Sequence, residues 1–100
     1  MEKAYEEIRS SLLDQLKELN KDTPYARKVV DNIVKSFRDV DRYEDDIEKN
    51  GVSYPDARGI IRPNPSIDNK RKEQASINAS LKLFDLQNPV IRSDMMDDYV

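Results

Sequence analysis

The sequence predicts an all-α protein of three main helices with one small β-prone connector, assembled as an oligomer. Three observations predict this fold class. Apolar residues recur every three or four positions in three segments, as on one face of a helix. Two of those segments begin with a polar residue followed by proline, which is typical of a helix start. Both glycines and three of the five prolines fall in residues 45–69, where the helical pattern is interrupted.

The first two helices are predicted over about residues 2–20 and 24–50. The apolar row of the first contains Tyr5, Ile8, Leu12, Leu16 and Leu19. Thr23 is the expected N-cap of the second helix, and Gly51 is expected to close it in a left-handed conformation. At about 1.5 Å per residue, 27 residues span about 40 Å, which exceeds what a compact chain of this length needs. We therefore expect this helix to form an oligomer interface through Val30, Ile33, Phe37, Val40 and Ile47.

The connector, residues 52–65, places the β-prone runs "VSY" and "GIIR" on either side of "PDARG". This pattern predicts a small hairpin, and the "PNP" that follows it is expected to be extended. The third helix is predicted from Pro65 or Ser66 to about Leu86, with Ser66 or Asn64 as its cap. We expect the first two helices to pair antiparallel and the third to pack back across them. The units are then an N-terminal helix (1–22), a helical core (23–86) and a mobile acidic tail (87–100).

The composition excludes several classes of protein. The chain has no Cys and no His, so it offers no Cys nucleophile, Ser-His triad or zinc site. Neither glycine lies in a phosphate-binding loop, and the carboxylates of residues 39–48 spread around a helix. We expect no catalytic residue, cofactor or metal, and hence no enzyme. Without an apolar run of membrane-spanning length or a signal peptide, the protein is expected to be soluble, cytoplasmic and free of membrane.

The charge is unevenly distributed, because a chain of net charge −3 carries five basic residues and one acidic residue over residues 58–72. These cations are predicted to contact DNA phosphates, and the start of the third helix is expected to add backbone N–H donors. They are Arg58, Arg62, Lys70, Arg71 and Lys72. A solvated turn with ordinary surface charge is the alternative. A second candidate surface on the long helix contains Arg27, Lys28, Lys35 and Arg38, for which a solvated, salt-bridged face is the alternative.

Several short motifs occur in a recognisable order. They are "DIEKNG" at residues 46–51, "VSY" at 52–54, "NPS" at 64–66, and a last helix with Asn78, Leu81, Leu83 and Leu86. With these motifs, residues 23–86 resemble the small subunit of phage terminases, in the branch found in tailed phages and prophages. The sequence departs from the family where a frequent "LGL" step reads Phe84-Asp85-Leu86, and where a basic N-terminal extension is replaced by an acidic start.

The resemblance implies a role in genome packaging. Such subunits assemble as rings, bind double-stranded viral DNA and deliver it to the large subunit in the host cytoplasm. The large subunit carries the ATPase and nuclease, and the small subunit is not an enzyme. The acidic tail is a candidate contact for the large subunit.

Two other classes of protein stay open. One is a helical oligomeric adaptor or scaffold that binds only protein. The other is a small helix-turn-helix regulator formed by the first two helices, which would be a dimer with a shorter recognition helix.

Overall fold

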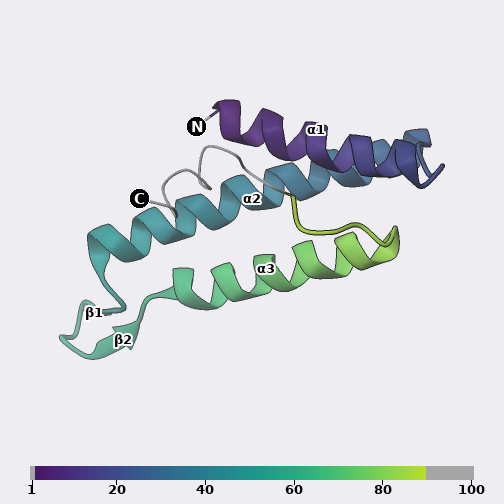
Figure 1. Cartoon of the computed structure of the whole chain (residues 1–100). Helices are drawn as coiled ribbons and strands as arrows, with labels where there is room; N and C mark the ends of the chain where they lie inside the picture. Colours follow the sequence, from purple (N-terminus) through teal and green to yellow (C-terminus); the bar gives the residue numbers. More distant parts are fainter. Residues whose placement is uncertain (1, 90–100) are drawn as a thin grey trace.

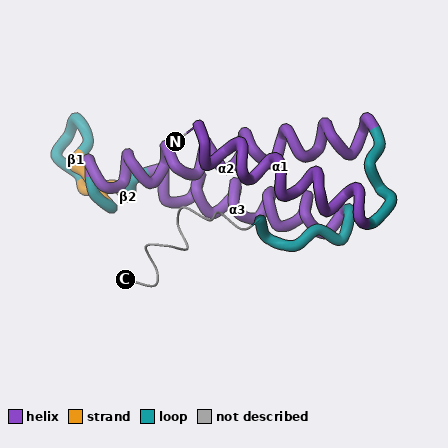
Figure 2. Tube along the Cα trace, turned by 45° about the horizontal axis from the view of Figure 1, so that its top comes forward, coloured by secondary structure: helices purple, strands orange, loops and turns teal. Residues whose placement is uncertain are grey.

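Within residues 2–89, three helices and a two-stranded hairpin follow one another, which confirms the predicted helical fold with its β-prone connector, while assembly as an oligomer stays a prediction (Figure 1). The computed structural model describes residues 2–89, so most of the predicted acidic tail lies outside the described residues. The elements are α1 (Glu2–Glu18), α2 (Pro24–Asn50), β1 (Ser53–Pro55), β2 (Ile61–Pro63) and α3 (Pro65–Leu83). The central helix α2 contacts both α1 and α3, and α3 packs back along it. Figure 2 shows the hairpin beyond one end of the helices.

The apolar core occupies only part of the length of α2. It is one cluster of Tyr5, Ile8, Leu12 and Leu16 from α1, Ala26, Val30, Ile33, Val34 and Val40 from α2, Ile77 and Leu81 from α3, and Leu86. Val40 is the last buried residue of α2. The remaining turns of α2 are therefore held largely by polar contacts.

The contacts between α1 and α2 end near the start of α1. The Tyr5 hydroxyl donates a hydrogen bond to Asp41, and the Arg38 guanidinium lies 4.7 Å from the Tyr5 ring centre. Burial, with a smaller contribution from Asp41, raises the pKa of Tyr5 to about 12. Arg38 also pairs with Glu2 at 2.8 Å. Beyond these contacts α2 continues past the end of α1 (Figure 1).

The helix starts follow the local chemistry of the sequence. The Thr23 hydroxyl accepts a hydrogen bond from the Ala26 N–H at 3.1 Å, so it caps α2 as predicted. Gly51 ends the same helix with a φ of 84°, and its N–H donates to the Ile47 carbonyl at 2.7 Å. Of the two candidates for the start of α3, Asn64 is the cap and Pro65 is the first helical residue.

The predicted end of the third helix was wrong by three residues. The helix α3 ends at Leu83 because Asp85 adopts a left-handed φ of 57°. The Leu86 N–H then donates to the Leu81 carbonyl at 2.8 Å, and the Asp85 N–H donates to the Lys82 carbonyl at 3.2 Å. This is the Schellman pattern of helix termination, with an apolar contact that returns Leu86 to the core.

The end of α1 uses the same pattern, with Asn20 at a φ of 57°. The Lys21 N–H donates to the Leu16 carbonyl at 2.8 Å. Because α1 ends at Glu18, Leu19 leaves the apolar row, and its side chain is 43% exposed. Its predicted place in the apolar row of the first helix was therefore wrong.

The chain is elongated, because its apolar core covers only part of the length of α2. Its extents are 56 × 34 × 19 Å and its radius of gyration is 16.5 Å. A compact domain of 100 residues has a radius of gyration of about 13 Å. A large part of each helix therefore stays exposed to solvent.

Two substitutions at Asp85 test the termination of α3. Asp85→Gly and Asp85→Ala both remove the ion pair with Lys21, which measures 2.9 Å. Only glycine accepts the left-handed backbone without a steric cost, so the glycine variant should melt roughly 5 °C above the alanine variant. Thermal denaturation followed by circular dichroism measures the difference. Equal melting temperatures would contradict this account of the helix end.

Candidate nucleic-acid interface

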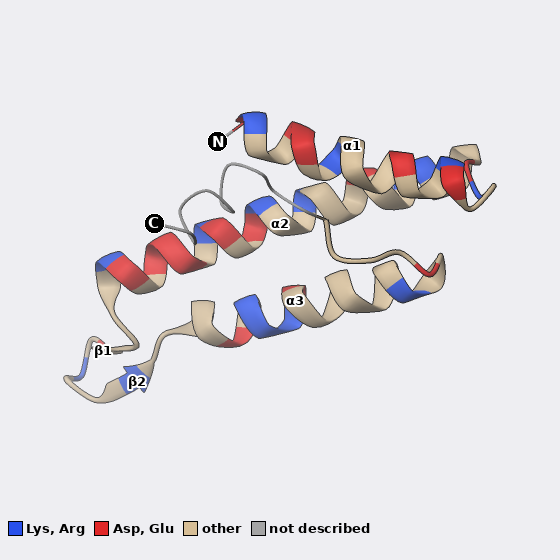
Figure 3. Ribbon diagram, in the orientation of Figure 1, with Lys and Arg blue, Asp and Glu red and all other residues tan. Residues whose placement is uncertain are grey.

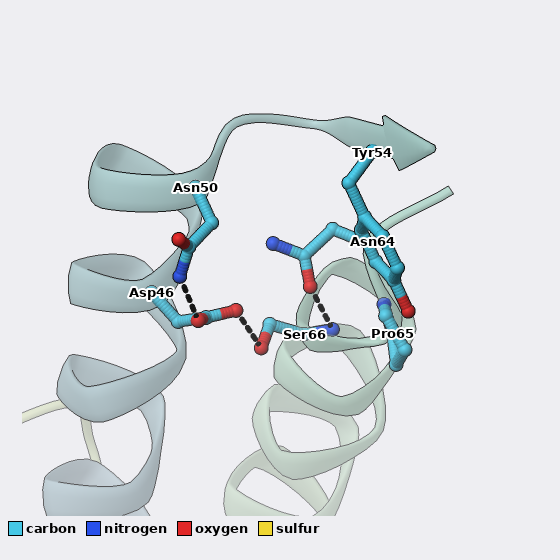
Figure 4. Close-up of a pocket in the computed structure, with 6 residues that line it drawn as sticks. All are labelled: Asp46, Asn50, Tyr54, Asn64, Pro65 and Ser66. Carbon is cyan, nitrogen blue, oxygen red and sulfur yellow. Dashed lines mark hydrogen bonds between the residues drawn. The ribbon is translucent and has the colours of Figure 1, made fainter. Parts of the chain in front are cut away.

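The end of α2, the base of the hairpin and the start of α3 meet at one polar junction (Figure 4). A shallow pocket there is lined by Asp46, Asn50, Tyr54, Asn64, Pro65 and Ser66, which we call the junction residues. They come from the motifs "DIEKNG", "VSY" and "NPS". The motifs that carry the family resemblance are thus separated in sequence but adjacent in space.

The side chain of Asn64 connects the two helix ends. It is the one buried polar residue among residues 2–89 and is 4% exposed. Its Oδ1 accepts a hydrogen bond from the Ser66 N–H at 3.0 Å, and its Nδ2 donates to the Gly51 carbonyl at 2.9 Å. The Asn64 backbone N–H donates to the Val52 carbonyl at 2.9 Å. One residue therefore caps α3, satisfies a carbonyl after α2 and closes the base of the hairpin.

A carboxylate on α2 completes the junction. Asp46 Oδ2 accepts a hydrogen bond from the Ser66 hydroxyl at 2.6 Å, and Asp46 Oδ1 accepts one from the Asn50 amide at 2.6 Å. Hydrogen bonds from Ser66, then from the amides of Asn64 and Asn50, hold the pKa of Asp46 below its ordinary value. The junction is therefore arranged to accept a charged carboxylate.

A second carboxylate, Asp56, organises the hairpin turn. Its Oδ1 accepts hydrogen bonds from the Arg58 N–H at 2.8 Å and the Ile60 N–H at 3.0 Å. Its Oδ2 accepts one from Arg62 Nε at 2.7 Å. These contacts, with Arg62 the strongest, lower the pKa of Asp56. The Arg62 side chain is therefore used within the hairpin, whereas no ion pair of Arg58 occurs among the described residues.

The three predicted cations of α3 lie on its first turns (Figure 3). Lys70 faces α2 and pairs with Glu44 at 3.2 Å. Arg71 is exposed and lies 3.8 Å from Asp68, a long contact between two exposed side chains that contributes little stability. Lys72 is exposed and has no ion pair in residues 2–89. With Arg58, the pair Arg71 and Lys72 is therefore the part of the cluster most available to a partner.

The basic row on α2 is exposed along its length. Two of its members are paired, Arg27 with Asp22 at 2.7 Å and Arg38 with Glu2 at 2.8 Å. The hydrogen bond that Arg27 donates to the Asp22 carboxylate raises the pKa of Arg27 above its ordinary value. Lys28 and Lys35 have no ion pair in the described part of the chain. The row thus combines salt-bridged and free cations.

One expectation about the start of α3 was wrong. The backbone N–H groups there were expected to be free for phosphate. The Ser66 N–H instead donates to the Asn64 side chain and the Ile67 N–H donates to the Asn64 carbonyl at 3.1 Å, while Pro65 has no N–H. The cap that positions α3 uses the donors that a phosphate would need.

The residues predicted to form an oligomer interface lie mostly inside the single chain. Val30, Ile33 and Val40 belong to its core, and Phe37 and Ile47 are partly exposed. An interface along this row could use only the exposed parts of Phe37 and Ile47, so its location stays a prediction.

Within residues 2–89, no group of three or more acidic side chains is arranged to hold a metal ion. No helix in the described range has the length and apolar character needed to cross a bilayer.

Together these features define a small helical protein with a braced, projecting hairpin. The family model described as phage terminase, small subunit, matches residues 6–97. The chain therefore belongs to the small-subunit family of phage terminases, whose role is in phage DNA packaging. The match extends well beyond the residues 23–86 whose motifs carry the resemblance. Comparisons with curated proteins and with solved structures gave no match.

Removal of the Asn64 side chain tests the junction. Asn64→Ala should lower the free energy of unfolding by about 2 kcal/mol, because the cap and a buried hydrogen bond are both lost. Urea denaturation measures this change. Asn69→Ala is the matched control, since Asn69 is exposed on the same helix. Similar losses in the two variants would contradict the role assigned to Asn64.

The charge of Asp46 predicts a pH dependence of stability. Its pKa is lower in the folded chain than in the unfolded chain, so the charged form stabilises the fold above about pH 4. That contribution is lost as the pH falls through the folded pKa. Asp46→Asn should therefore lose less stability than the wild type between pH 6 and pH 3, as measured by thermal melts. Asp14→Asn, at an exposed position on α1, should behave as the wild type.

Proposed function

We propose that this chain binds double-stranded viral DNA and delivers it to the large terminase subunit in the host cytoplasm. The family match over residues 6–97 carries the proposal, because it assigns the chain to DNA packaging. Delivery follows from the division of labour that the resemblance implies, in which the ATPase and nuclease belong to the large subunit. The acidic residues proposed to contact that subunit, Asp94, Asp97 and Asp98, lie outside the described residues.

The DNA-binding surface proposed here combines the tip of the hairpin with the first turns of α3. Arg58, Arg71 and Lys72 supply its most available charge, and Arg62 and Lys70 add charge that is already partly neutralised. Cations on a phosphate polymer release condensed counterions, which makes the affinity depend strongly on salt. Because base edges need specific donors and acceptors, such a surface supports binding without strong sequence preference.

The exposed row on α2 is proposed as a second, weaker contact through Lys28 and Lys35, with Arg27 and Arg38 held partly by their carboxylate partners. In the expected ring, each copy would repeat this row. Repetition converts weak single contacts into useful avidity without any new interaction.

A double substitution on α3 tests DNA binding. Arg71→Ala with Lys72→Ala should weaken binding and reduce the slope of log K against log salt by up to about 2. Fluorescence anisotropy with labelled duplex DNA from 50 to 300 mM salt measures both quantities.

The matched control removes two other exposed cations, Lys17→Ala with Lys82→Ala, for the same change in net charge. Equal effects in both double variants would reject this surface as the site. Absence of binding by the wild type at low salt would favour the protein-only adaptor instead.

A further inference from the structure

The tip of the hairpin presents one long basic side chain. Arg58 is exposed, and its guanidinium has no hydrogen bond or ion pair among residues 2–89. The residues on either side of it, Ala57 and Gly59, are small and exposed. Because the hairpin lies beyond one end of the helices (Figure 2), this slim tip is open to a partner.

The backbone that carries Arg58 is held in place by the turn itself. The Asp56 N–H donates a hydrogen bond to the Ile60 carbonyl at 2.8 Å, and the Gly59 N–H donates to the Asp56 carbonyl at 2.9 Å. Gly59 has a φ of 79°, a left-handed conformation that glycine adopts without a steric cost. A partner would therefore meet an ordered tip, which lowers the conformational entropy lost on binding.

The hairpin is poorly suited to reading a sequence through the major groove of DNA. Readout there requires several donors and acceptors directed at base edges. Arg62 is tied to Asp56 at 2.7 Å, and Tyr54 lines the junction pocket. Each strand is only three residues long. Few polar side chains of the hairpin thus remain for base edges.

Apolar side chains follow the tip. Ile60 is 50% exposed and Ile61 is 66% exposed, and Pro55, the strand partner of Ile61, is also exposed. A phosphate attracts charge but offers no apolar surface. The walls of the minor groove consist largely of deoxyribose C–H groups, and minor-groove proteins often place apolar side chains there. These residues therefore continue the proposed DNA surface in a way that suits the minor groove.

Arginine is also the cation that suits this groove. Its planar guanidinium is more weakly hydrated than the ammonium group of lysine, so it loses less when it leaves water. The minor groove of B-DNA is only about 6 Å wide, and in A·T tracts it is narrower and its negative potential is enhanced. Arg71 and Lys72 lie at the same end of the molecule (Figure 3) and remain available for phosphates.

We propose that Arg58 enters the minor groove of the DNA with Ile60 and Ile61 against its sugar walls, while Arg71 and Lys72 contact the flanking phosphates. The hairpin then reads the width of the groove and gives the protein a preference for A·T-rich duplexes. This inference rests on the proposed binding of double-stranded DNA. It adds readout of DNA shape to phosphate contacts that by themselves carry no sequence information.

Fluorescence anisotropy with two duplexes of equal length, one an A·T tract and the other made only of G·C pairs, tests the inference at one salt concentration. The wild type should bind the A·T duplex roughly tenfold more tightly. Distamycin, which fills the minor groove of A·T tracts, should remove this preference. Arg58→Ala should lower the ratio of the two affinities to about one, since the remaining contacts are to phosphates. Ile60→Ser with Ile61→Ser should lower the ratio without a change in charge.

Two control variants separate the tip from general charge. Lys17→Ala removes an exposed cation of α1 with the same change in net charge as Arg58→Ala. Arg71→Ala with Lys72→Ala should weaken binding to both duplexes alike. Both controls should keep the wild-type ratio. All the substituted side chains are exposed, so thermal melts should show folded variants.

Three results would overturn the inference: equal affinity of the wild type for the two duplexes, a preference that survives in Arg58→Ala, or a preference removed by methyl green in the major groove but not by distamycin. Salt-dependent binding without any preference would reject this inference alone and leave the proposed function standing. Absence of binding to either duplex at low salt would reject both.

Discussion

The position of the hairpin depends on one buried amide, the side chain of Asn64. Its oxygen caps α3 and its nitrogen satisfies the Gly51 carbonyl beyond the end of α2. A buried polar group stabilises a fold only when its partners are in place, so these bonds specify a single arrangement of the two helix ends. Asp46 extends the arrangement by accepting hydrogen bonds from both sides of the junction. The direction in which the chain leaves α2 is thereby set.

Different forces hold the two halves of the molecule. On α2 the buried apolar core ends at Val40, and the turns after it are joined to α3 by hydrogen bonds and by the ion pair between Glu44 and Lys70. This division explains why the chain is elongated and why its hairpin projects. At the hairpin end, polar contacts hold the backbone in place, so the apolar and basic side chains there remain exposed. Exposed side chains of this kind suit a subunit that functions by binding. The main proposed contact with DNA, through the hairpin tip and the first turns of α3, uses this end.

Local patterns in the sequence predicted much of the fold. Periodicity located the three helices, and Thr23, Pro24 and Gly51 marked the limits of α2 because capping depends on nearest neighbours. Leu19 and the end of α3 were misassigned because Asn20 and Asp85 adopt left-handed conformations that these residues only sometimes take. The candidate cations were found by charge alone. Their availability could not be predicted, since Glu44 and Asp56 approach Lys70 and Arg62 only in the folded chain.

The sequence by itself determined the class of fold, the family and the helix starts. The helices depend on residue types a few positions apart, and the family is identified by short motifs in a fixed order. The tertiary structure decided which residues remain available. It enclosed Val30, Ile33 and Val40 within one chain and left Val52, Ile60 and Ile61 exposed. It also brought three motifs into one hydrogen-bonded junction. The physical reason is that burial and pairing depend on distances between segments far apart in the chain, and only packing sets those distances.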